Sequence, residues 1–255
     1  HSYLPSANKT AEKFSGKFNT QQFHRLIRRL AGAFGPSSYA VKDERTGEFI
    51  YVDDSLDRIW GYPASDLYDN GAHFFSGIIL PEFKHHHIRL TRAGLEYITR
   101  LAPDQLLMAS VNYDLPSRKK SGEIVRILSR RIVLRLNSGG KIRICLLLFT
   151  DISHIKPSGL ESPPRLSIHL PNSNTLLVYN QCAGNMIDLN ILSSRQREIL
   201  RLYSRDLGTS AIAEKLNISS HTVRTHSANI RKKIDCKNLA ELVYFSKCHL
   251  LAYHL

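Results

Sequence analysis

Three short helical patterns, separated by tight polar breaks, follow one another between residues 192 and 234 of this chain. The first should begin with a capping box, in which Ser193 and Gln196 satisfy each other's backbone N–H groups. The breaks fall at residues 207–209 and 217–219, and Ser219 is a natural N-cap for the third helix. Helices joined by so short a turn are typical of a helix-turn-helix, which leaves this segment little freedom of fold.

The third helix, expected over residues 220–234, sorts into two faces on a 3.6-residue period. Val223, Ile230 and Ile234 share one sector, with Ser227 beside them, and this stripe can pack on the two preceding helices. The opposite and flanking positions are His221, Thr222, Arg224, Thr225, Ala228, Asn229, Arg231 and Lys232. An arginine there can reach a guanine or a phosphate, and the helix N-terminus offers N–H groups to a phosphate. The pattern predicts a DNA-binding face, a merely solvated basic face being the alternative interpretation.

The charge of the whole chain agrees with an anionic partner. The net charge is +13 and the isoelectric point is near 9.7, which favours nucleic acid over membrane. Residues 190–255 hold 11 Lys and Arg against 5 Asp and Glu, so the excess is spread over the chain. The four scattered cysteines fit neither a disulfide framework nor a zinc ribbon and suggest a reducing cytoplasm.

No membrane attachment is expected. The longest apolar run, residues 144–149, is too short to span a bilayer, and residues 1–16 lack the apolar core of a signal peptide. Residues 1–16 are expected to be a loose tail. Residues 18–34 have apolar side chains at helical spacing, and this helix could pack on its own domain or form a dimer.

Residues 36–155 show a fixed order of elements. Two strands in 38–53 flank a turn at 45–47, and short helices follow Asp54 and Pro63. A longer helix over 81–101 then leads to strands at 106–115, 123–136 and 141–152, the last two joined by a turn at 137–140.

This order resembles the PAS sensory domain. The resemblance is carried by Phe49-Ile50-Tyr51-Val52-Asp53, Gly61-Tyr62-Pro63-Ala64-Ser65-Asp66-Leu67, Gly139-Gly140-Lys141 and the terminal Asp151-Ile152-Ser153. A linker rich in Pro, Ser and Gly follows at 157–164, and then comes a small hairpin over 165–179. The hairpin could extend the sensor sheet or bridge to the next domain.

The C-terminal segment resembles the LuxR-type helix-turn-helix domain over residues 192–251. The motifs are Leu192, Arg195, Arg197-Glu198-Ile199-Leu200, Ile212-Ala213-Glu214-Lys215-Leu216, Ile218-Ser219, Thr222-Val223-Arg224-Thr225-His226, Asn229-Ile230, Lys232-Lys233-Ile234 and Ala240-Glu241-Leu242-Val243. The resemblance implies four helices, of which the third enters the major groove and the fourth, expected over 238–250, often mediates dimerisation.

Family positions also suggest roles for single residues. Arg224, Thr225 and Ala228 stand where the family reads bases, while Thr222, His226 and Lys232 stand nearer the DNA backbone. The chain departs from the family at Asp206, where a glycine is usual, and at Ser210-Ala211, where Lys-Glu is usual.

Other chemistry is not supported by the sequence. The run His85-His86-His87 lacks the i, i+4 spacing of a helical metal pair and is expected to be solvated or partly packed. We found no nucleophile elbow, P-loop or dinucleotide fingerprint. Cys145 lies in an expected strand, which argues against the flavin photochemistry of some PAS relatives.

The sequence therefore predicts an α+β chain, with a PAS-like antiparallel sheet and helices followed by an all-α four-helix LuxR-type domain. Its expected parts are a tail and helix (1–35), a PAS-like domain (36–156), a linker and hairpin (157–188) and the DNA-binding domain (189–255).

We expect a cytoplasmic transcription regulator, not an enzyme, without cofactor, metal or membrane. Its expected partners are double-stranded DNA, a second copy of the chain, and a small-molecule or protein ligand at the PAS-like domain. The expected DNA contacts are His221, Thr222, Arg224, Thr225, His226, Ala228, Asn229, Arg231 and Lys232. Two alternatives stay open: an interaction adaptor, or a haem or metal sensor using the histidine run.

Overall fold

The structure is a computed structural model that describes residues 36–155, 163–170 and 175–249. Its first part comprises β1 (Ser37–Asp43), β2 (Phe49–Val52), α3 (Leu56–Trp60), α4 (Ala64–Asn70), α5 (His73–Ile78), α6 (Pro81–Ile98), α7 (Pro103–Met108), β3 (Ser110–Arg118), β4 (Ile124–Leu136) and β5 (Ile142–Asp151). Its second part comprises β6 (Arg165–Leu170), β7 (Thr175–Asn180), β8 (Asn185–Asp188), the 3-10 helix η2 (Leu189–Ile191), α8 (Ser194–Tyr203), α9 (Thr209–Lys215), α10 (Ser220–Ile234) and α11 (Leu239–His249). The expected tail and helix within residues 1–35 lie outside the described residues, as does most of the expected linker.

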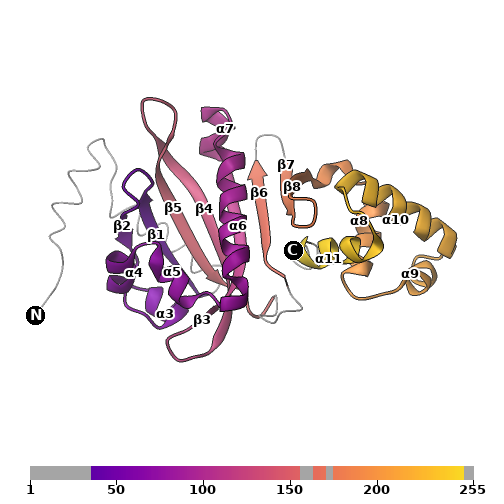
Figure 1. The fold of residues 1–255 in the computed structure, drawn as a ribbon, viewed down its shortest axis with the longest axis horizontal. Coiled ribbons are helices and arrows are strands. Elements are labelled where there is room, and N and C mark those ends of the chain that lie inside the picture. The colour runs from indigo at the N-terminus through magenta and orange to yellow at the C-terminus, as the bar shows by residue number, and fades with distance from the viewer. Residues whose placement is uncertain (1–35, 156–162, 171–174, 250–255) are drawn as a thin grey trace, which may run out of the picture.

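All eight described strands form one antiparallel sheet in the order β2-β1-β5-β4-β3-β6-β7-β8 (Figure 1). The first five strands and the helices between β2 and β3 follow the expected PAS-like order. Helices α8–α11 form the separate all-α part at the far end of the sheet. The expected fold class is confirmed.

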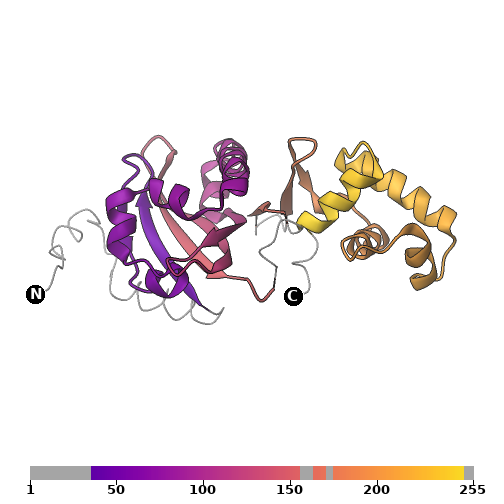
Figure 2. The same cartoon turned by 60° about the horizontal axis from the view of Figure 1, so that its bottom comes forward.

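Helices α3, α4 and α5 cover one face of the sheet (Figure 2). Side chains of α3 and α5 pack in one core with residues of β1, β4 and β5, where Trp60 lies edge-on to the ring of Phe149 at 5.1 Å between centroids. Gly61 ends α3 in a left-handed conformation (φ 76°), which a residue without a Cβ adopts at little cost.

Helix α6 packs across β3 and β6. Leu90 and Ile98 of α6 share a core with residues of both strands. A side chain at Gly94 would meet Val111 at 3.0 Å and Leu166 at 3.3 Å, so the helix approaches the sheet this closely because position 94 has no Cβ.

One expectation about local structure was wrong, and two elements were not foreseen. The strand expected from Leu106 begins at Ser110, because Pro103 starts the short helix α7, in which Leu106 is buried. The sequence also did not reveal helix α5 or strand β8. The short apolar runs in α5 and α7 fit a strand and a short buried helix equally well, so only packing decides between them.

The expected hairpin both extends the sensor sheet and bridges to the helical part. Strand β6 pairs with β3, and β7 pairs with β6 and β8. Along β7 the side chains alternate between two cores, because successive residues of a strand point to opposite faces. Leu177 and Tyr179 pack with α6 and β3, whereas Val178 packs with the core of α8–α11. No helix within the described ranges is long and apolar enough to cross a membrane.

Candidate DNA interface and sensor cavity

Helix α8 begins with the expected capping box. The Ser193 hydroxyl accepts the N–H of Gln196 at 3.2 Å, and the Gln196 carboxamide oxygen accepts the N–H of Ser193 at 3.0 Å. The same Gln196 oxygen accepts a hydrogen bond at 3.0 Å from Lys233 on α10. A lysine inside the basic helix therefore anchors that helix to α8, a structural role that the sequence did not suggest.

The breaks around α9 depend on left-handed backbone. Asp206 has φ 61° and Asn217 has φ 52°, and both side-chain types tolerate this region better than most. The φ of 61° at position 206 explains why glycine is usual there in the family. Here the carboxylate of Asp206 also pairs with Lys247 of α11 at 2.6 Å, so the departure from glycine adds a contact between the α8–α9 loop and α11.

The expected inner stripe of α10 is buried. Val223, Ile230 and Ile234 are fully covered by the helical core, and Ser227 lies among them. The hydroxyl of Ser227 donates to the carbonyl of Val223 at 2.8 Å and lies 3.0 Å from the hydroxyl of Tyr203 on α8. This polar pairing explains why a serine is accommodated in an otherwise apolar stripe.

The other face of α10 points to solvent. His221, Arg224, Thr225, Asn229 and Lys232 are exposed, while Thr222, His226, Ala228 and Arg231 are partly covered. Within the described part of the chain, neither Arg224 nor Lys232 forms an ion pair. The helix N-terminus is ordered by Ser219, whose hydroxyl accepts the N–H of Thr222 at 3.0 Å.

Three of the nine expected contact residues have a side-chain partner inside the protein. The hydroxyl of Thr222 lies 2.8 Å from the hydroxyl of Ser219. Arg231 donates to the carbonyl of Lys237 at 3.0 Å, beyond the end of α10. Thr225 donates its hydroxyl to the carbonyl of His221 at 3.1 Å. Arg224 and Lys232 therefore remain the two basic side chains of this face with most freedom to reach DNA.

Short helices that present an exposed basic helix on a common core define a helix-turn-helix DNA-binding domain. Residues 190–246 match the family model described as bacterial regulatory proteins, luxR family. The C-terminal domain of this chain belongs to that family.

Curated relatives match over the same part of the chain. The Fimbriae Z protein of Escherichia coli (strain K12) is 35% identical over 72 residues, which cover 28% of this chain and 34% of that protein. The oxygen regulatory protein NreC of Staphylococcus aureus (strain JH9) is 41% identical over 68 residues, covering 26% and 31% respectively. The chain thus spans about a third of the length of these relatives.

Solved structures resemble the chain weakly. VqmA of Vibrio cholerae, in a complex with ligand and DNA, is 17% identical and covers 91% of this chain and 88% of its own, with a TM-score of 0.35. A PAS domain from Colwellia psychrerythraea is 15% identical and covers 51% and 98%, with a TM-score of 0.36. Because both TM-scores are low, the PAS-like character of the sensor half rests on its element order and sheet.

A cavity of about 30 Å³ lies between the sheet and helices α5 and α6. Aromatic and aliphatic side chains form most of its wall, together with His87, Ser117 and Ser129. Nδ1 of His87 and the hydroxyl of Ser129 are buried and have no hydrogen-bond partner among the described residues. Burial, and to a lesser degree the nearby Arg131, lowers the pKa of His87, so the ring is neutral at pH 7. The cavity wall is therefore apolar, with two unsatisfied polar atoms.

The histidine run diverges into three environments. His85 is exposed, His86 contacts Gln181 at 2.9 Å between Nδ1 and Oε1, and His87 lines the cavity. The described ranges contain no group of three or more His, Cys, Asp or Glu placed to hold a metal. Cys145 is buried in β5, and this burial raises the pKa of its thiol to about 12.

Proposed function

We propose that the chain is a transcription regulator in which the PAS-like domain controls the luxR-type domain. The observation that carries this proposal is the exposed basic face of α10, held in place by a fully buried stripe. Arg224 and Thr225 are proposed to read bases, with Ala228 beside them. Thr222, His226 and Lys232 are proposed to lie nearer the DNA backbone. The remaining proposed contacts, to which no separate role is assigned, are His221, Asn229 and Arg231. Acting on DNA, such a bacterial regulator works in the cytoplasm.

The test is a binding titration of the full chain on selected genomic fragments at several salt concentrations. Log K should fall with log salt by about 0.9 for each phosphate neutralised. Arg224→Ala should relax sequence preference, with a loss of about 1–3 kcal/mol at the preferred site, whereas Lys232→Ala should weaken all sites evenly. Arg92→Ala is a matched control, because Arg92 is a 79% exposed arginine on the sensor helix α6. Equal effects of Arg224→Ala and Arg92→Ala would contradict the assignment of this face.

We also propose that the active form is a dimer. Helix α11 begins with Leu239, an apolar side chain that is 44% exposed and could pack against a second copy of the chain. A dimer of helix-turn-helix domains binds two half-sites about one helical turn apart. A footprint over one half-site, with a single chain per DNA duplex in sedimentation, would contradict the dimer.

For the sensor cavity we propose a small neutral ligand with one polar group and a flat apolar body. The unpaired His87 nitrogen and Ser129 hydroxyl suit the polar group, and the ring edges and faces of Trp60, Phe75 and Phe149 suit the apolar body. A cavity of about 30 Å³ accommodates ordered water, so a larger guest has to displace α5 or α6.

A thermal-shift screen of neutral heterocycles tests this ligand proposal, because a ligand that binds only the folded chain raises the melting temperature. The shift should be smaller for Ser129→Val. An equal shift in Ser129→Val would place the compound elsewhere.

A further inference from the structure

The end of β7 and the turn that follows it contact both domains through three consecutive residues, Tyr179, Asn180 and Gln181. The carbonyl of Tyr179 lies 3.0 Å from Nε2 of His249 on α11. Asn180 donates from Nδ2 to the carbonyl of Ile234 at 2.6 Å, which is the last residue of α10. Asn180 and Gln181 are 1% and 7% exposed, so the DNA-binding helix ends against a buried turn rather than in solvent.

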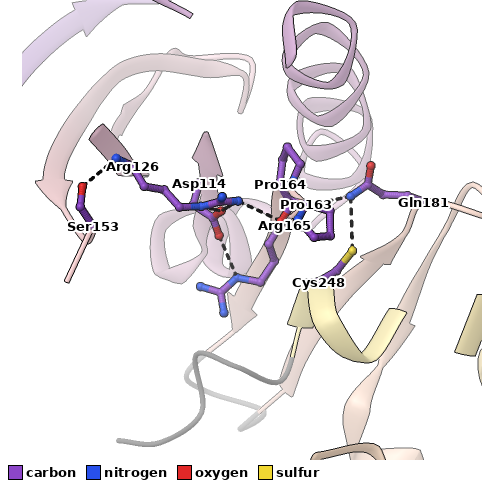
Figure 3. Close-up of polar contacts among 8 residues, drawn as sticks. All are labelled: Asp114, Arg126, Ser153, Pro163, Pro164, Arg165, Gln181 and Cys248. Atoms are coloured by element: carbon purple, nitrogen blue, oxygen red, sulfur yellow. Dashed lines mark hydrogen bonds and ion pairs between the residues drawn. The ribbon is translucent and has the colours of Figure 1, made fainter. Parts of the chain in front are cut away.

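Gln181 connects this turn to the sensor helix. Its side-chain oxygen accepts a hydrogen bond from Arg89 at 3.1 Å and lies 2.9 Å from Nδ1 of His86, both on α6. Its amide nitrogen donates to the carbonyl of Pro164 at 2.6 Å and lies 3.8 Å from the sulfur of Cys248 on α11 (Figure 3). One buried carboxamide thus contacts the sensor helix, the start of β6 and the fourth helix of the luxR-type domain.

The segment before β6 is fixed from the sensor side as well. Arg126 donates to the carbonyl of Pro163 at 2.9 Å and pairs with the carboxylate of Asp114, as Figure 3 shows. Pro163 and Pro164 are therefore held between a buried ion pair of the sheet and Gln181. Because both prolines are held by hydrogen bonds, the segment before β6 cannot easily move to compensate for a displacement of Gln181.

On α6, the residue that lines the cavity is next in sequence to a residue that contacts Gln181. His87 lines the cavity, while its neighbour His86 and the nearby Arg89 hold Gln181. Side chains of adjacent helical residues point about 100° apart, which places the two contacts on different sides of one rigid element. A displacement of α6 at the cavity must change the geometry at Gln181.

We propose that the Asn180–Gln181 turn is the coupling element of this protein, carrying a displacement of α6 to the C-terminal end of the DNA-binding helix. A shift of α6 would displace Gln181 through its contacts with Arg89 and His86. The adjacent Asn180 would then move together with the carbonyl of Ile234, to which it donates a hydrogen bond. The proposal rests on the function proposed above, and it concerns the regulation of that function.

Hydrogen exchange of the full chain without DNA tests the coupling directly. Arg89→Ala should speed exchange of backbone amides at the end of α10 and in α11, although Arg89 belongs to the sensor. Arg92→Ala, on the same helix but 79% exposed, should leave these amides unchanged. If Arg89→Ala leaves their exchange at the wild-type rate, the coupling element is wrongly assigned.

A double-mutant cycle in DNA affinity then separates this route from others. Arg89→Ala and Gln181→Ala should each change affinity by about 2- to 30-fold. In the Gln181→Ala background, Arg89→Ala should have a much smaller effect, because only the contact of Arg89 with the Tyr179 ring is left to lose. Fully additive effects would overturn the proposal. Gln181→Glu keeps the acceptor for Arg89 but loses the donor to Pro164, and it serves if Gln181→Ala does not fold. Absence of sequence-preferring binding, with the exchange response intact, would refute the regulator function and not the coupling.

Discussion

Replacing Asp114 with alanine removes the carboxylate around which two arginines gather inside the sensor sheet. Arg126 approaches Oδ1 of Asp114 through Nη2 at 2.6 Å and Nε at 2.7 Å, and Nε of Arg165 lies 3.6 Å from Oδ2. The side chains of Asp114 and Arg126 are both fully buried. Removing one partner of a buried pair leaves an uncompensated charge and costs about 3–5 kcal/mol. We therefore expect Asp114→Ala to lower the free energy of unfolding by that amount.

Urea unfolding followed by the fluorescence of Trp60, the chain's only tryptophan, measures this loss in the domain concerned. Glu96→Ala is the control, because it breaks an exposed pair in which Arg92 and Glu96 are 79% and 62% exposed and which is worth about 0.5 kcal/mol at most. Asp114→Asn keeps an acceptor for Arg126 and should fall between the two. If Asp114→Ala costs no more than Glu96→Ala, the reasoning about buried charge in this sheet is refuted.

Three further outcomes follow from local geometry. Ser193→Ala removes the hydroxyl that caps α8 and should cost about 1 kcal/mol in urea unfolding; Ser194→Ala, one position on, should cost less. Asn217→Gly should raise the melting temperature and Asn217→Ala should lower it, because φ is 52° there; the reverse order would contradict this. Below pH 6.5 the unfolded chain takes up a proton that the folded chain resists at His87, whose pKa burial lowers. Stability should therefore decline as pH falls from 6.5, and less steeply in His87→Gln.

Much of the luxR-type domain could be predicted because its determinants are local. Caps at Ser193 and Ser219 act over three residues, and the stripe of α10 repeats at helical spacing. The unusual Asp206 could be noticed against the family pattern, but only its φ of 61° explains the position. The nine DNA contacts stay a prediction, although the structure shows which of them are exposed.

The sensor half was less predictable, since its decisive features depend on residues far apart in the chain. Arg126 lies in an alternating strand in which a charged residue is expected to face water. Strand register instead pairs Arg126 with Pro116, so that its side chain reaches the diagonal neighbour Asp114, 12 residues earlier, in a fully buried pair. Helices α5 and α7 were not foreseen because short apolar runs take their form from packing.

By itself, the sequence determined the helices of the DNA-binding domain, their breaks and the face of α10 that packs inward, because hydrogen bonds and side-chain periodicity over a few residues set these. Only the tertiary structure decided that the hairpin extends the sensor sheet and packs against the helical domain. It alone brought Gln181 to His86, 95 positions away, and Asn180 to the end of α10, 54 positions away. Such contacts depend on how β6 pairs with β3 and how α6 packs over them, and no local pattern encodes either.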